Sequence, residues 1–166
     1  MPDNKRSQEK VIIVGNSPSI LLHEFGEQID SYDIVIRVNR CVTKGFEKYI
    51  GKKINIWATT RTDTIDSYVP ENYKDIKYLW SRTKKSNPNT KDSKTGKYYL
   101  KLPKDFPQEA LDKRYIMFKN QKWYQNYDTF LKPFDLTKEP CTGLLTILTA
   151  CRFYDDITVH GFTFGI

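Results

Sequence analysis

The sequence predicts an α/β domain built on a parallel β-sheet. A continuous apolar run, Val11–Val14, ends at Gly15, and such runs are typical of strands buried on both faces of a sheet. A second apolar run, Ile34–Ile36, follows a stretch with helical spacing, so the chain opens as strand, turn, helix, strand. Alternation of strands and helices favours a layered parallel sheet with right-handed crossovers.

The later elements continue this alternation. Leu21, Leu22, Phe25 and Ile29 lie at helical spacing, and either Ser17 or Ser19 is placed to cap that helix. A strongly apolar helix is expected at Thr142–Phe153. The further expected elements are strands at Asp33–Val38, Ile54–Ala58, Ile76–Trp80, Tyr115–Phe118 and Ile157–Gly161, and a short aromatic helix at Gln121–Phe130.

Size and composition exclude several classes of protein. With 166 residues, 39% apolar and 28% charged, the chain suits one globular domain and not a collagen or a disordered protein. No apolar run approaches the ~20 residues of a membrane helix, and the N-terminus has no apolar signal core. The three cysteines are odd in number and match no zinc spacing, which favours free thiols in a reducing compartment. We therefore expect a cytoplasmic protein and leave peripheral attachment to a membrane open.

The charge of the chain is concentrated in one segment. The net charge is +7, and Arg82–Lys97, with six basic residues and one acidic residue, supplies +5 of it. This segment has no apolar residue and contains Asn87-Pro88-Asn89, so it is typical of a loop. We expect residues 1–9 and 83–97 to be flexible. A basic patch for nucleic acid or an anionic membrane is the alternative interpretation.

Polar residues follow the expected strands where ligands bind in open parallel sheets, at the carboxyl ends. Gly15-Asn16-Ser17 lacks the further glycines of a dinucleotide fingerprint, but its turn suits a small anion or a nucleotide edge. Asn39 follows the second strand. Thr142 and Gly143 open the apolar helix, whose first amides can hold a phosphate. Taken singly, each motif also fits an ordinary turn or helix cap.

The titratable residues give weaker signals. His160 ends the last strand and lies nearer the expected site than His23, which falls inside the first helix. Asp63 and Asp66 follow the third strand and are best explained as a loop pair. No group of His, Cys, Asp and Glu has the spacing of a metal site, so no metal is expected.

Two stretches together resemble the sialyltransferases of glycosyltransferase family 29. Residues 11–17, 29–40 and 43–53 are similar to the long motif of that family. Residues 140–162 are similar to its short motif, whereas residues from about 64 to 139 match only weakly. Two motifs in the right order and at a family-like separation are more specific than either one alone.

The resemblance implies a Rossmann-like fold, a variant of the GT-A type, and an inverting transfer from CMP-sialic acid to a hydroxyl of a glycan acceptor. It also implies that a histidine deprotonates that hydroxyl, whose oxygen attacks the anomeric carbon as CMP leaves. By position it assigns donor contacts to Asn16, Ser17, Asn39, Thr142 and Gly143, and it places Gly161 on the floor of the site. A monophosphate leaving group can be stabilised by amides and hydroxyls, so no cofactor or metal is expected. Related CMP-sugars such as CMP-Kdo stay open.

The chain departs from the family pattern at three places. Val11 and Tyr154 stand where animal members have a disulfide, and Cys141 replaces a small hydroxyl residue. The two later motifs, which carry the histidine base, have no counterpart before Ile166, and His160 matches neither. We therefore expect residues 1–166 to be a single, C-terminally truncated domain with much of the donor site but without its base, for which His160 is a weak candidate.

The alternative function is a non-catalytic nucleotide- or nucleic-acid-binding module, suggested by the basic segment and by 14% aromatic residues. Salt-sensitive binding of RNA would favour it, whereas binding of CMP with little salt dependence would favour the glycosyltransferase. The glycosyltransferase interpretation predicts no nucleic-acid partner.

Overall fold

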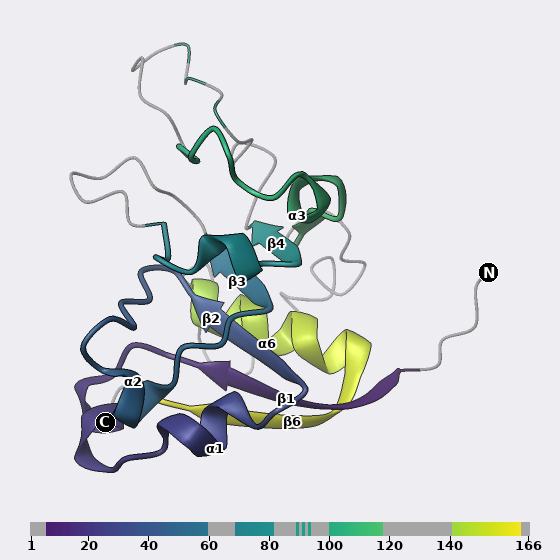
Figure 1. Ribbon diagram of the computed structural model, residues 1–166. Coiled ribbons are helices and arrows are strands. Elements are labelled where there is room, and N and C mark those ends of the chain that lie inside the picture. The colour runs from purple at the N-terminus through teal and green to yellow at the C-terminus, as the bar shows by residue number, and fades with distance from the viewer. Residues whose placement is uncertain are drawn as a thin grey trace.

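A parallel β-sheet forms the centre of the computed structural model, which describes residues 6–59, 69–81, 89, 91, 93, 100–117 and 141–163 (Figure 1). Its six strands are β1 (Ser7–Val14), β2 (Ile34–Val38), β3 (Ile56–Thr59), β4 (Tyr78–Ser81), β5 (Tyr115–Ile116) and β6 (Tyr154–His160). Each pair of neighbouring strands is parallel. The predicted parallel α/β class is therefore confirmed.

The strand order is β5-β4-β3-β2-β1-β6. The chain moves outward from β1 to β5 on one side and then returns to the other side of β1 with β6. Val11 consequently pairs with Ile34 of β2 and with Ile157 of β6. The point where the winding reverses lies between β1 and β6, and in open parallel sheets such a point is where ligands bind.

Helices cover both faces of the sheet. This is required because successive side chains of β1 point to opposite faces and are buried on both. Val11 and Ile13 pack with Leu145 of α6 (Thr142–Phe153), which covers this face of β1 and β2 (Figure 1). Ile12 and Val14 face the other way, toward Ile20. The helices on that second face are η1 (Pro18–Leu22), α1 (Gly26–Asp30), α2 (Glu47–Ile50) and, beyond β3, η2 (Tyr73–Asp75) and α3 (Gln108–Asp112).

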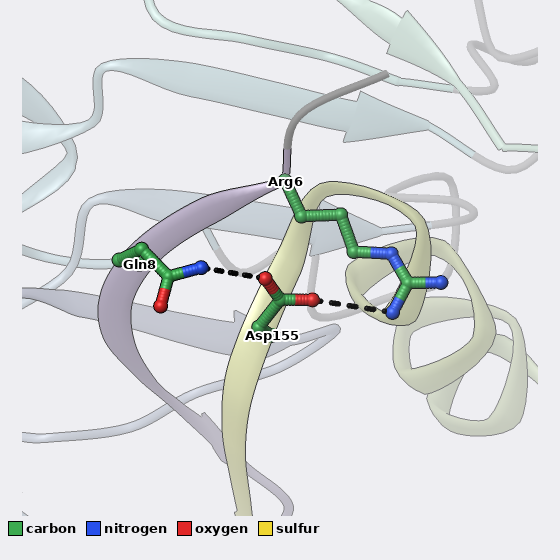
Figure 2. A network of polar contacts seen from close by, with 3 residues as sticks. All are labelled: Arg6, Gln8 and Asp155. Carbon is green, nitrogen blue, oxygen red and sulfur yellow. Dashed lines mark hydrogen bonds and ion pairs between the residues drawn. The ribbon is translucent and has the colours of Figure 1, made fainter.

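Strand β1 is longer than the sequence predicts. This strand begins at Ser7, four residues earlier than its apolar run predicts, and Ser7 pairs with Tyr154. Ser7–Glu9 were expected to be flexible and belong instead to the sheet, while residues 1–5 lie outside the described residues. Figure 2 shows that Asp155 accepts hydrogen bonds from Arg6 Nη1 at 3.3 Å and from Gln8 Nε2 at 2.7 Å. These exposed contacts fix the start of β1 with little energy each.

The prediction of one continuous helix through Leu21–Ile29 is wrong. The structure has the 3-10 helix η1, an extended residue at His23, and then the separate helix α1. Gly26 lies so close to α2 that an added Cβ would be 1.9 Å from the Glu47 carbonyl oxygen. The chain must bend before Gly26 to reach that contact. Ser17, and not Ser19, is the N-cap of η1.

The other predicted boundaries differ by small amounts. The bounds of α6 are confirmed, and β6 starts at Tyr154 because the chain passes directly from α6 into the strand. β3 and β4 start two residues later than predicted: Ile54 and Ile76 contribute to the core, but they precede the strands. The predicted helix at 121–130 and the pair Asp63 and Asp66 lie outside the described residues.

The structure describes residues 89, 91 and 93 of the segment 83–97, and Asn89 is anchored by hydrogen bonds. Asn89 has a φ of 54°, its N–H donates to the Leu100 carbonyl at 2.8 Å, and its Oδ1 accepts from the Leu102 N–H at 3.0 Å. Within the described parts of the chain, no helix is long and apolar enough to cross a membrane.

Candidate functional site

The site forms where β1 and β6 end side by side. The Gly15 N–H donates to the His160 carbonyl at 2.8 Å, and the Ser17 N–H donates to the Gly161 carbonyl at 2.9 Å. The turn after β1 and the turn after β6 are therefore bonded to each other over three residues. This brings the Gly15-Asn16-Ser17 motif and Gly161, which are far apart in the sequence, to one edge of the sheet.

Two glycines allow a phenyl ring to join these turns to α6. A Cβ added at Gly15 would lie 2.2 Å from the Gly161 carbonyl oxygen and 2.8 Å from Cδ2 of Phe162. A Cβ added at Gly143 would lie 2.8 Å from Cε1 of the same ring. Phe162 thus sits between the β1 turn and the first turn of α6. Its ring contacts require glycine on both sides, which the sequence motifs alone did not indicate.

Position 161 also requires glycine, because of its backbone conformation and its contact with Ile20. Its φ is +74°, in the left-handed region that side chains disfavour, and an added Cβ would lie 2.7 Å from Cδ1 of Ile20. The turn after β6 is consequently folded back against η1, which places its backbone beside the β1 turn.

Asn16 and Asn39, the two asparagines predicted to bind the donor, connect this edge to β2 and β3. Asn16 is exposed, and its Nδ2 donates to the carbonyl of Val38, the last residue of β2, at 2.8 Å. Asn39 follows directly and has a φ of 52°. Its N–H donates to the Ala58 carbonyl at 2.7 Å, and its carbonyl accepts from Trp57 Nε1 at 2.8 Å. The peptide groups of Asn39 are therefore held by β3.

The start of α6 provides the third part of the site. Cys141 is the N-cap, and its Sγ accepts from the Leu144 N–H at 3.5 Å. Thr142 and Gly143 are buried in the first turn, which contains no acidic residue. A helix start of this kind carries partial positive charge from its N–H groups and attracts anions.

The structure brings most of the predicted residues together. Asn16, Ser17 and Gly161 lie on the bonded turns, Gly143 reaches them through Phe162, and Asn39 is linked through the contact of Asn16 with Val38. Ser17 is only 8% exposed, and its hydroxyl lies 2.9 Å from the Ser19 hydroxyl while it caps η1. Its side chain thus has a local structural role at the edge of the site.

His160 is at the expected edge but on the face away from α6. It pairs with Val14, whose side chain packs under η1 and α1, and its ring meets Phe25 edge-on at 5.4 Å between centroids. His160 lines a cavity of about 110 Å³ together with Phe25, Gln28, Tyr32 and Thr158, among others. Its Nε2 is buried and has no hydrogen-bond partner among the described residues. The structure therefore does not bring His160 to Thr142 and Gly143.

The burial of His160 predicts a pH dependence of stability. Loss of water around the ring lowers the pKa of His160 in the folded chain, whereas an unfolded histidine titrates near 6.5. As the pH falls below about 6.5, the unfolded chain takes up this proton more readily, so the free energy of unfolding decreases. We expect His160→Gln to flatten this decrease in urea unfolding measured between pH 7.5 and 5.5.

His23 provides the control for this measurement, because it is the other histidine of the chain and is exposed in the fold. His23→Gln should keep the decrease of wild type toward low pH. An equal slope for wild type and His160→Gln would show that His160 is protonated as readily in the folded chain as in the unfolded one.

The cysteines are free thiols, as predicted. Cys41 is buried in the core, and burial raises the pKa of its thiol to about 12, so it stays protonated. Cys141 and Cys151 are exposed. Among the described residues, no group of three His, Cys, Asp or Glu side chains is placed to hold a metal ion.

The fold and the site define a class of protein. A doubly wound parallel sheet with glycine turns at its switch point, next to the start of a long helix, is typical of α/β proteins that bind nucleotides or other phosphate-bearing ligands at that edge.

Comparison with known proteins identifies the family. The model of glycosyltransferase family 29 (sialyltransferase) matches residues 1–165, so the chain belongs to this family. A CMP-N-acetylneuraminate-β-galactosamide-α-2,3-sialyltransferase 1 of Gallus gallus is 24% identical over 94% of this chain and 44% of its own length. A β-1,6-galactosyltransferase of Arabidopsis thaliana is 48% identical over 44 residues, which are 26% of this chain and 11% of that protein.

The fold is shared with a solved enzyme of known class. The crystal structure of a mammalian sialyltransferase superimposes with a TM-score of 0.65 at 20% identity, over 94% of this chain and 55% of that chain. The chain thus spans less than half of the Gallus gallus relative and about half of the solved structure.

Proposed function

We propose that this chain carries the donor site of an inverting glycosyltransferase that transfers sialic acid from CMP-sialic acid to a hydroxyl of a glycan acceptor. The observation that carries the proposal is the meeting of the β1 turn, the β6 turn and the start of α6 around Phe162, in a chain of glycosyltransferase family 29. A GT-A-type variant of the fold, a reaction that needs no metal and a cytoplasmic location belong to the same proposal.

Each part of the site has a chemical role in this reaction. The N–H groups at the start of α6, with the Thr142 hydroxyl beside them, would stabilise the CMP phosphate as negative charge builds up on it. Asn39 would hydrogen bond to the nucleotide from the end of β2, and Asn16 would do so from the turn after β1. The glycines allow the ligand to approach the backbone closely. A base that deprotonates the acceptor would complete the machinery, and none is assigned to the described residues.

A different donor is the second candidate, because a short stretch of this chain also matches a galactosyltransferase. A stretch of 44 residues is 48% identical to the Arabidopsis thaliana galactosyltransferase, and a stretch of 50 residues is 46% identical to an α-2,3-sialyltransferase of Rattus norvegicus. That stretch alone therefore does not distinguish donors. CMP and UDP are the probes that do, since they are the leaving groups of monophosphate- and diphosphate-activated sugars.

Calorimetric titration of the 166-residue chain tests the proposed function. We expect CMP to bind, with UDP much weaker, with little dependence on salt, and equally well in the presence of EDTA. Preferential binding of UDP would favour the second donor. Loss of CMP binding in EDTA would contradict a metal-independent site, and RNA binding that weakens steeply with salt, without CMP binding, would favour the nucleic-acid module.

Asn39→Ala should weaken CMP binding without unfolding the domain. A hydrogen bond to a charged group contributes about 1.5–3 kcal/mol, which corresponds to a loss of affinity of roughly 10- to 150-fold. Asn72→Ala is the matched control, because Asn72 donates to the Lys52 carbonyl at the opposite, amino-terminal edge of the sheet. Equal CMP affinities of wild type and Asn39→Ala would remove Asn39 from the site.

A further inference from the structure

Trp57 in the middle of β3 connects the core to the candidate site. Its ring is fully buried and packs in the cluster of Leu79, Phe106 and Ala110, at a centroid distance of 6.3 Å from Phe106. Its indole Nε1–H leaves this apolar cluster and donates to the Asn39 carbonyl at 2.8 Å. A buried indole N–H needs a partner, and here that partner is the backbone of a predicted donor-binding residue.

The Trp57 bond matters because of the conformation of Asn39. Asn39 has a left-handed φ of 52°, a conformation that most residues other than glycine disfavour and that asparagine adopts more readily than they do. Its N–H is held by the Ala58 carbonyl and its own carbonyl by Trp57, so adjacent residues of β3 hold both peptide groups that flank its Cα. With both peptide planes held, the Cα–Cβ direction of Asn39 is set by the core and not by the loop that follows.

We propose that Trp57 is a positioning residue for donor binding: its indole N–H holds Asn39 in the left-handed conformation that directs the side chain toward the nucleotide. This inference rests on the proposed function, because it assumes that Asn39 contacts the donor. Trp57 itself is fully buried on the sheet face opposite α6, so it offers no exposed surface to a ligand.

Trp57→Phe tests the proposal, since it keeps an aromatic ring in the cluster and removes only the indole donor. We expect CMP affinity to fall about 3- to 10-fold, the effect of one ordinary hydrogen bond. Trp80→Phe is the matched control: Trp80 lies on the next strand, faces α6 and packs against Tyr115 and Phe153. It should leave CMP affinity unchanged, although both substitutions lower stability.

A double-mutant cycle with Asn39→Ala separates positioning from a general effect on the fold. If Trp57 acts through the Asn39 side chain, Trp57→Phe should change CMP affinity less than about twofold in the Asn39→Ala background. The same loss in both backgrounds, or a Trp57→Phe affinity equal to that of wild type, would overturn the proposal while leaving Asn39 in the site. If Asn39→Ala binds CMP like wild type, the donor role of Asn39 and the positioning role of Trp57 both fail.

A measurement on the wild-type chain covers the case in which Trp57→Phe does not fold. Because coupling between two sites is reciprocal, CMP bound at Asn39 should stabilise the Trp57 hydrogen bond. We expect saturating CMP to slow hydrogen exchange of the Trp57 indole N–H severalfold in NMR spectra, without slowing that of Trp80. Unchanged exchange at Trp57 in the presence of bound CMP would overturn the proposal.

Discussion

Gly15→Ala is expected to abolish most CMP binding. The added methyl group would overlap the Gly161 carbonyl, at 2.2 Å, and the Phe162 ring, at 2.8 Å. A backbone carbonyl cannot rotate away as a side chain can, so the β1 and β6 turns must separate. Forcing a methyl group into a packed site costs about 1–3 kcal/mol, and we expect CMP affinity to fall by roughly tenfold or more as the site opens. Calorimetry measures the affinity, and urea unfolding measures the loss of stability.

Gly45→Ala is the control for this effect. Gly45 has a φ of +82°, but an added Cβ would meet nothing within 4 Å. Its substitution should therefore cost stability through backbone strain alone and leave CMP binding as in wild type. A Gly15→Ala variant that binds CMP as well as Gly45→Ala would show that the contact between the two turns is not needed for the donor site.

Arg37→Met is expected to cause the largest loss of stability. The side chain is 1% exposed, and it donates from Nη2 to the Ile50 carbonyl at 2.8 Å and from Nε to the Lys53 carbonyl at 2.9 Å. Methionine fills similar space but leaves both carbonyls without these donors. At about 1–3 kcal/mol for each buried group left unpaired, we expect the free energy of unfolding to fall by about 3 kcal/mol.

Arg37 matters for stability because it holds the short segment that follows α2. Asp30 accepts hydrogen bonds from the N–H groups of Lys52 and Lys53, and Arg37 holds carbonyls on both sides of the same turn. Burial lowers the pKa of the Arg37 guanidinium, yet arginine stays charged in proteins. The side chains of Asp30 and Arg37 therefore fix the turn after the four-residue helix α2.

Arg6→Met is the matched control for Arg37→Met. Arg6 is exposed and makes a surface ion pair with Asp155, so its loss should change the free energy of unfolding by less than about 1 kcal/mol (Figure 2). Midpoints of urea unfolding, with equal slopes, compare the two variants. Similar midpoints would show that the buried arginine contributes no more than a surface ion pair.

The long, continuous patterns were the most predictable from sequence. Val11–Val14 predicted a strand buried on both faces, and Thr142–Phe153 predicted α6 with both bounds, because many apolar residues contribute to each signal. The first helix was not predictable in the same way. Its apolar spacing spans a break at His23 that depends on the close contact of Gly26 with Glu47, a residue of a different helix.

The sequence by itself determined the parallel α/β class, the family and the positions of the polar motifs after the strands, because these depend on local pattern and residue type. The tertiary structure decided which of them meet. Phe162 between Gly15 and Gly143, the bond from Trp57 to Asn39, and the turning of His160 away from α6 each join segments distant in the chain. Such contacts depend on the strand order and on which face a residue occupies, and a one-residue difference in register reverses that face.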